Sequence, residues 1–510
     1  MAPAYSSPAA AGASAQSLCA PSPEADLARQ LGNRIWWKAL ICGLVADSFS
    51  WQKGNGLNLT VYALTIILSA ASVLDLRFGC VPKTSARLLQ LAGVFALLFS
   101  VRDSAELALL NMIACGTCLV LALAVAAPIP LVEFTNARVR DVVRSISMSG
   151  VETFAGAIPL IARVALSQQA IKRVALLRTI RLFAIAGSVA ALFGTLLSSG
   201  DPVFRNTIHG MFNWNPGTIF SHFGFVLLFA WPVMGLLWSN MDMLRTESST
   251  WAWHVSGLPL KSADVVSALV ALNGVFFAFV ALQARALFGG QQYVRATTGL
   301  SLADYARSGF FTLIFTSGLV VSLLLALNAL LENKKGLSSS KSMQLLSLAV
   351  LAQVGVVLAS SAARMTIYMN VYGASIERFY CMTIIGWLAL VMIWFAVTVL
   401  RNRPARFAFG SITLAWTTVL ALNIANPDVI IAQNHLARAA GGERYDRDFL
   451  AGQLSADAVP LLVNAINVET AMRVALPPNS CSATALCAAI PAVQRRWTTP
   501  ATQTTLGNWT

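Results

Sequence analysis

Charged residues are scarce in this sequence: Asp, Glu, Lys and Arg make up 11% of its 510 residues, whereas 56% are hydrophobic. An ordinary soluble domain carries about 25% charged residues, and a soluble chain of this size could not bury so much apolar surface. The net charge of +14 does not indicate nucleic-acid binding, because Lys and Arg occur in short gaps that flank apolar stretches. We expect a membrane protein with no nucleic-acid partner.

The sequence also lacks the common catalytic motifs. It contains no G-x-S-x-G, no H-E-x-x-H, no P-loop and no kinase signature, which removes the frequent hydrolase and nucleotide-driven classes. Cys115 and Cys118 form a C-x-x-C inside an apolar stretch, with no second ligand pair nearby, and we interpret them as small packing residues. His209 and His435 could form a two-histidine metal site, but we expect no metal, and no cofactor can be named.

The N-terminus has no signal-peptide pattern. Residues 1–25 are mostly Ala, Ser and Pro, without a basic region followed by an apolar one. This composition favours disorder, and we expect residues 1–35 to form a disordered leader.

Eleven apolar stretches follow, and they predict an all-α polytopic membrane protein with about 11 transmembrane helices. A bilayer core of about 30 Å needs about 20 helical residues, so the first and third stretches are short and could be tilted or re-entrant. The expected spans are 37–50, 57–74, 88–102, 104–128, 181–200, 217–238, 263–285, 308–331, 343–363, 380–400 and 407–425.

The distribution of Lys and Arg predicts the orientation. With the N-terminus in the cytoplasm, the inner segments hold 22 of these residues and the short outer loops hold 8. Cytoplasmic loops carry an excess of Lys and Arg, so we expect the C-terminus outside. The domains are then a first transmembrane group (36–128), a cytoplasmic arm (129–180), a second transmembrane group (181–425) and an external tail (426–510).

The arm at 129–180 interleaves Arg and Lys with Val, Ile and Leu at helical spacing. A basic amphipathic helix of this kind typically lies on an anionic leaflet. Membrane lipids are therefore its expected partner, and a cytoplasmic docking protein is the alternative.

The external tail begins with a helix-start signal. Asn426, Pro427 and Asp428 supply a cap, an N1 proline and an early acid in the right order, and Gly441 follows the expected helix. Further short helices are expected near 446–450 and 455–466. Cys481 and Cys487 lie further on, where an external location would allow them to form a disulfide.

The polar residues of the outer loops are the candidate site. Arginines there could bind phosphate or carboxylate, acids could serve as bases, and tyrosines could stack on a sugar or line a lipid headgroup. Each also has a structural explanation, as helix cap, ion pair, turn or interfacial anchor. The candidates are Asp201, Asp304, Arg307, Arg364, Tyr368, Tyr372, Glu377, Arg378, Asn426 and Asp428.

These loops resemble a family of bacterial polytopic inner-membrane proteins classed as a domain of unknown function. The resemblance covers roughly residues 35–470 and implies a multi-pass location in a bacterial inner membrane. It implies no activity and no catalytic residue. The matching motifs are Asp201 to Phe204, Phe288 to Gly290, Gly299 to Arg307, Arg364 with Tyr368 and Tyr372, Asn426 to Asp428, and Leu454 to Pro460.

Three functions fit the sequence. The first is a binding, sensing or scaffolding protein of the cell envelope, with a lipid-linked component as a candidate ligand. The second is a membrane-embedded transferase or hydrolase that acts on a lipid-linked or phosphate-bearing substrate at the outer leaflet. The third is a passive transporter or flippase, which the lack of ionisable groups at mid-depth in the spans disfavours. The first is our expectation.

Overall fold

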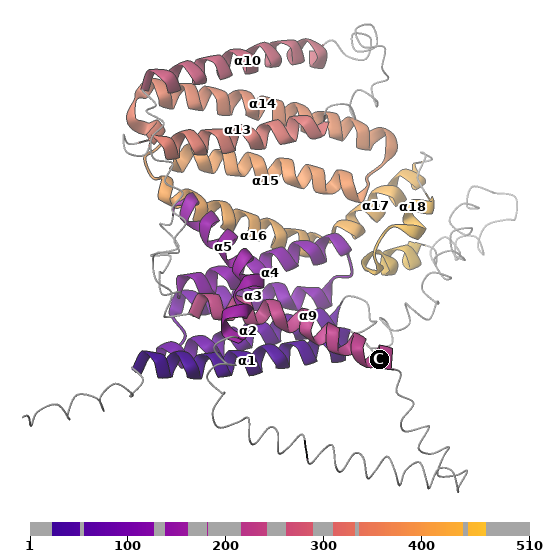
Figure 1. The fold of residues 1–510 in the computed structure, drawn as a ribbon. Helices are drawn as coiled ribbons and strands as arrows, with labels where there is room; N and C mark the ends of the chain where they lie inside the picture. The colour runs from indigo at the N-terminus through magenta and orange to yellow at the C-terminus, as the bar shows by residue number, and fades with distance from the viewer. Residues whose placement is uncertain are drawn as a thin grey trace, which may run out of the picture.

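The computed structural model describes residues 23–50, 56–126, 138–161, 181, 216–241, 262–288, 310–331, 336–441 and 447–465, and these residues are helical with short connections. Figure 1 shows the long helices stacked side by side with nearly parallel axes. The helices are α1 (Pro23–Ser50), α2 (Leu57–Phe78), α3 (Lys83–Val101), α4 (Ala105–Val125), α5 (Val139–Ala155), α9 (Pro216–Met241), α10 (Ser262–Phe288), α13 (Phe310–Leu330), α14 (Lys341–Tyr372), α15 (Ile376–Thr398), α16 (Phe407–Ala425), α17 (Pro427–Ala440) and α18 (Arg447–Gly452), with 3-10 turns η4 (Gly336–Ser339), η5 (Pro404–Arg406) and η6 (Ala456–Ala458).

Nine of the described helices are long and apolar enough to cross a membrane. The prediction of an all-α polytopic membrane protein is therefore confirmed. Helix α1 is not among the nine, because Arg34, Lys38 and Asp47 lie along it. The expected span at 181–200 lies outside the described residues, apart from Arg181.

Helices α1 and α14 extend furthest beyond the spans expected from sequence. Helix α1 begins at Pro23, so residues 23–35 of the expected leader are helical. Pro23 at the first position and Glu24 after it favour a helix start. Helix α14 continues to Tyr372 and has 32 residues, about 48 Å at 1.5 Å per residue. It therefore includes Arg364 and Tyr368, which we expected in a loop.

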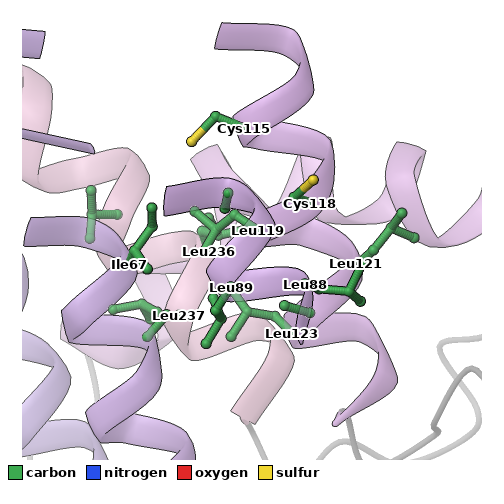
Figure 2. Packing of buried hydrophobic residues seen from close by; sticks show 14 of the residues in the cluster. Ile67, Leu88, Leu89, Cys115, Cys118, Leu119, Leu121, Leu123, Leu236 and Leu237 are labelled. Carbon is green, nitrogen blue, oxygen red and sulfur yellow. The ribbon is translucent and has the colours of Figure 1, made fainter. Parts of the chain in front are cut away.

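A first bundle is formed by α1 to α4 together with α9. Its core contains leucines of these helices with Cys115 and Cys118, as Figure 2 shows. Both cysteines are buried free thiols, which agrees with their interpretation as packing residues. Hydroxyls inside the bundle donate to backbone carbonyls, for example Ser85 Oγ to Ala122 O at 2.8 Å. Such pairing is needed where no water can satisfy polar groups.

A second bundle is formed by α10, α13, α14 and α15 around a separate core. Side-chain hydrogen bonds join α10 to α14 in this bundle. Asn273 Nδ2 donates to Leu346 O at 3.1 Å, and Gln353 Nε2 donates to Asn273 Oδ1 at 3.3 Å. The two bundles thus have independent hydrophobic cores.

Helix α16 lies between the bundles (Figure 1) and packs on both. On one side, the rings of Phe407 and Phe395 of α15 meet edge to face, with centroids 5.6 Å apart. On the other side, Trp416 Nε1 donates to Thr117 Oγ1 of α4 at 3.1 Å. Helix α16 therefore connects the two bundles.

Helix α5, part of the expected basic arm, packs on α9. Trp231 Nε1 donates to Phe154 O at 2.8 Å, and Gly235 lets the backbone of α9 approach Thr153 O, where a Cβ atom would collide. The apolar side chains of Val143, Val151 and Phe154 of α5 are exposed.

Candidate functional site

The C-terminal helices form a small domain that we call the cap, made of α17, α18, η6 and the helical residues that continue to Ala465. Its core consists of Ile431, Ala432, Leu450, Leu454, Ala458 and Leu462. Figure 1 shows it at one end of the long helices, which we call the cap end.

Helix α17 starts as the sequence predicts. Asn426 takes a left-handed conformation with φ of 53°, its side chain accepts from Val429 N at 3.5 Å, and Pro427 occupies the first turn. Because Asn tolerates this conformation and also caps a helix, the chain turns there directly from α16 into the cap. The first turn of α17 thereby places Asp428 at the junction.

The cap meets the second bundle at the end of α14. His435 Nε2 donates to Ala374 O at 2.7 Å, and Arg438 donates to Asn370 O at 2.7 Å and to Val371 O at 3.2 Å. Carbonyls in the last turn of a helix have no partner within it. Helix α17 therefore caps α14 from outside.

Gly373 allows α17 to approach the end of α14 closely. It has φ of 82°, and a Cβ atom on it would lie 2.7 Å from His435 Cε1. Asn434 Oδ1 accepts from Ala374 N at 3.2 Å beside it. A residue with a side chain at position 373 would have both a strained backbone and a steric conflict with His435.

Three of the predicted site residues meet at the turn between α14 and α15. The Arg378 guanidinium lies over the Tyr368 ring, 4.4 Å from its centroid, and Arg378 Nη1 donates to Gly373 O at 2.5 Å. The Tyr368 and Tyr372 rings are 4.8 Å apart. Tyr372 is 52% exposed, so this cluster presents an aromatic and cationic surface at the cap end.

The remaining predicted residues of α14 and α15 lie around this turn. Arg364 lies one helical turn before Tyr368 and is buried. Glu377 is exposed in the first turn of α15, after Ser375, which accepts from Arg378 N as the N-cap. Asp201, Asp304, Arg307, Cys481 and Cys487 lie outside the described residues.

The cap meets the first bundle at the turn between α3 and α4. Asp103 N donates to Asp457 Oδ2 at 3.3 Å, and Ala456 N donates to Asp103 Oδ2 at 3.2 Å. Beside them, Ser104 Oγ donates to Glu106 Oε2 at 3.0 Å. The contacts of Asp103 therefore join η6 of the cap to the first bundle.

Asn423 ties α16 to the same bundle. Arg102 donates to Asn423 O through Nε at 2.9 Å and through Nη2 at 2.5 Å. The Asn423 and Asn111 amides, both buried, exchange two hydrogen bonds at 2.8 and 3.0 Å. Two complementary amides satisfy each other in an apolar interior, where either alone would be costly.

Asp428 is the most enclosed of the cap acids whose side chains the structure describes, with 1% of its surface exposed. Both the amide and the hydroxyl of Ser455 donate to its Oδ2, while its Oδ1 has no hydrogen-bond partner among the described residues. Burial raises the pKa of Asp428, and Glu106 and Asp103 raise it further, although the Ser455 donors oppose them. These surroundings therefore stabilise the neutral form of Asp428 more than water does.

Asp457 shares this environment. Burial, together with Asp428 and Asp103, raises the pKa of Asp457 to about 6, even though Arg102 and the Asp103 amide favour the charged form. We call Asp103, Glu106, Asp428 and Asp457 the acidic cluster. Within the described part of the chain, no three His, Cys, Asp or Glu side chains are arranged to hold a metal ion.

Sequence reasoning found Asp428 of this cluster but not its neighbours. Asp103 and Glu106 lie more than 300 residues from Asp428 in the chain, and only tertiary packing brings them together. The available signal was the spacing of Asp103 and Glu106, three positions apart at the start of α4, and this spacing resembles an ordinary helix start.

Comparison with known protein families shows which family this sequence matches. The family described as "Domain of unknown function (DUF4153)" matches residues 89–465. The chain belongs to this family. The match starts within α3 and ends with the last described residue of the cap, so the DUF4153 region includes the whole acidic cluster and the Tyr368, Tyr372 and Arg378 surface. No curated protein and no solved structure matches the chain.

Proposed function

We propose that this DUF4153 protein is a binding, sensing or scaffolding protein of a bacterial inner membrane, with the cap outside the cytoplasm. One observation carries the proposal: the cap is hydrogen-bonded to both bundles, through Asp103 on the first and through the end of α14 on the second. A domain held by both bundles can transmit a change in one to the other.

The distribution of basic residues supports this orientation. The connections at the end opposite the cap carry Arg77, Lys83, Arg401, Arg403 and Arg406, and an excess of Lys and Arg is typical of cytoplasmic loops. The same rule supports a location of α5 and the rest of the 129–180 arm beside the anionic inner leaflet, where its exposed apolar side chains would contact lipid.

The ligand that best fits the cap end is an anionic, sugar-bearing or phosphate-bearing envelope component. The exposed Tyr372 ring offers a stacking face, and Arg378 uses one N–H group on Gly373 O. A guanidinium has five N–H donors, so the others can bind a phosphate or carboxylate.

Native mass spectrometry of the protein extracted in polymer discs of its own membrane tests this proposal. We expect a bound anionic lipid or lipid-linked sugar in the wild type and in Arg401→Ala, an exposed arginine at the opposite end. Tyr372→Ala and Arg378→Ala should each retain about fivefold less, the effect of losing roughly 1 kcal/mol of stacking or cation–π energy. Equal retention in all four proteins would contradict the proposed surface.

The acidic cluster favours a second candidate, a transferase or hydrolase for lipid-linked substrates. A carboxyl such as Asp457, with a pKa of about 6, is suited to general acid–base chemistry near neutral pH. Incubation of the purified protein with a short-chain polyprenyl diphosphate sugar tests it: product formed by the wild type and absent with Asp457→Asn would replace the binding proposal.

A further inference from the structure

The contact between the cap and the first bundle concentrates carboxyl groups from three parts of the chain. Asp103 and Glu106 come from the turn into α4, Asp428 from the first turn of α17, and Asp457 from η6. Among the described residues, the Arg102 guanidinium acts on Asp457, and it already donates twice to Asn423 O. Asp103 and Glu106 are exposed, but their charges act on the enclosed Asp428, so ionisation of Asp428 places a further negative charge beside them.

Asp428 adds an independent observation. Its side chain is 99% enclosed, and its Oδ1 has no hydrogen-bond partner among the described residues. A charged carboxylate in such a place normally accepts hydrogen bonds on both oxygens, whereas a protonated one avoids the cost of an unpaired buried charge. The unpaired Oδ1 of Asp428 thus costs less in the neutral carboxyl than in the charged carboxylate.

The other titratable groups around Asp428 do not compensate its charge. Helix α15 contributes the Tyr380 hydroxyl, which interacts with the carboxyls of Asp428, Glu106 and Asp457. Helix α16 has no ionisable side chain. On α17 itself, His435 is hydrogen-bonded to Ala374 O in the turn after α14, and Arg438 donates to Asn370 O of α14. Arg378 of α15 is held by Gly373 O and the Tyr368 ring.

We propose that Asp428 and Asp457 form a proton-binding latch within the acidic cluster, which holds the cap on the first bundle when these two carboxyls are protonated and loosens as they ionise. The inference goes beyond the proposed function, because it concerns how the cap is held and needs no ligand. The raised pKa values of Asp428 and Asp457 support it.

The direction of the pH effect follows from these shifts. A carboxyl whose pKa is higher in the docked state binds its proton more tightly there, so docking is strongest below the undocked pKa of about 3.9. It weakens as the pH rises through about 6, the pKa of docked Asp457. A shift of about two units corresponds to at most about a 100-fold change in the docking equilibrium.

Hydrogen–deuterium exchange of the full-length protein in lipid discs measures the latch. After correction for the intrinsic effect of pH on exchange, we expect the peptide 454–465 to lose at least about tenfold protection between pH 5 and pH 8. Asp457→Asn keeps an acceptor for the Asp103 amide but cannot ionise, so it should lose less protection at pH 8 than the wild type does, with Asp428 left as the titrating carboxyl. Asp75 is an exposed acid near the end of α2 that lies opposite the cap. As a control, Asp75→Asn should show the same pH dependence of protection as the wild type.

Two outcomes would overturn the inference. One is the same pH dependence in the wild type and in Asp457→Asn, or none in either. The other is loss of protection in Asp457→Asn at every pH, which would mean that the charged carboxylate itself holds the cap through Arg102. Asp428→Asn risks misfolding, so Asp103→Asn serves as the second variant. The latch requires the exchange protection of the peptide 454–465 to depend less on pH in Asp103→Asn than in the wild type.

Discussion

The amide of Asp103 donates to the carboxylate of Asp457 across 354 residues of chain, and the Asp103 carboxylate accepts in return from Ala456, the neighbour of Asp457. This reciprocal contact joins the first bundle to the cap. Because the cap is also hydrogen-bonded to the end of α14, it is the part of the described structure where both bundles and the C-terminal helices meet.

The thermal stability of the protein should decrease as the pH rises from about 4 to about 7. The folded pKa of Asp457 is about 6, above its unfolded value of about 3.9, so its contribution is fully present below the lower value and lost above the higher one. The loss is at most about 3 kcal/mol and smaller in practice, because the side chain is partly exposed to solvent that screens its charge. Unfolding midpoints between pH 4.5 and 8 measure it, and a midpoint that rises with pH in the wild type but not in Asp457→Asn would contradict the prediction.

Removing one amide of the Asn111–Asn423 pair should destabilise the protein more than removing both. Asn423→Leu leaves the buried Asn111 amide without its partner, which should cost about 1–3 kcal/mol. The double variant Asn111→Leu with Asn423→Leu should recover much of this, since it leaves neither amide unpaired. A double-mutant cycle on unfolding midpoints gives the coupling, and strictly additive effects would mean that the pair does not act as a unit.

Gly373→Ala should loosen α17 from α14. Position 373 has φ of 82°, and the new Cβ would conflict with the His435 ring, so the destabilisation should exceed about 1 kcal/mol. Gly93→Ala is the matched control, because a Cβ at Gly93 of α3 has open space and alanine favours a helix. Hydrogen exchange of α17 distinguishes them, and equal protection in both variants would count against the contact.

Thiol labelling should place the two ends of the bundles on opposite sides of the membrane. Cys80 is exposed beyond the end of α2 opposite the cap, and Gln453 is exposed in the cap. With Cys80 as the single cysteine, a membrane-impermeant maleimide should react only in inside-out vesicles. A variant with Gln453→Cys as the single cysteine should react only in right-side-out vesicles, and the reverse pattern would invert the proposed topology.

Local features of the chain were predictable from sequence. The apolar stretches predicted the membrane class, because about 20 consecutive apolar residues have few other stable environments. Asn426, Pro427 and Gly441 predicted the bounds of α17, since capping depends on backbone geometry within one turn. The family resemblance was also correct. By contrast, the ends of α1 and α14 were misjudged because a helix can continue past its apolar residues when tertiary contacts support it.

The amino-acid sequence by itself determined the class of protein and the start of the cap, since hydrophobicity and capping act over one helix. Only the tertiary structure decided the division into two bundles, the central position of α16 and the pairing of Asn111 with Asn423. It also brought Asp103 to Asp457 and enclosed Asp428. These relationships depend on which helix faces pack together, and burial and neighbouring charges, which set the protonation of a carboxyl, exist only after that packing is complete.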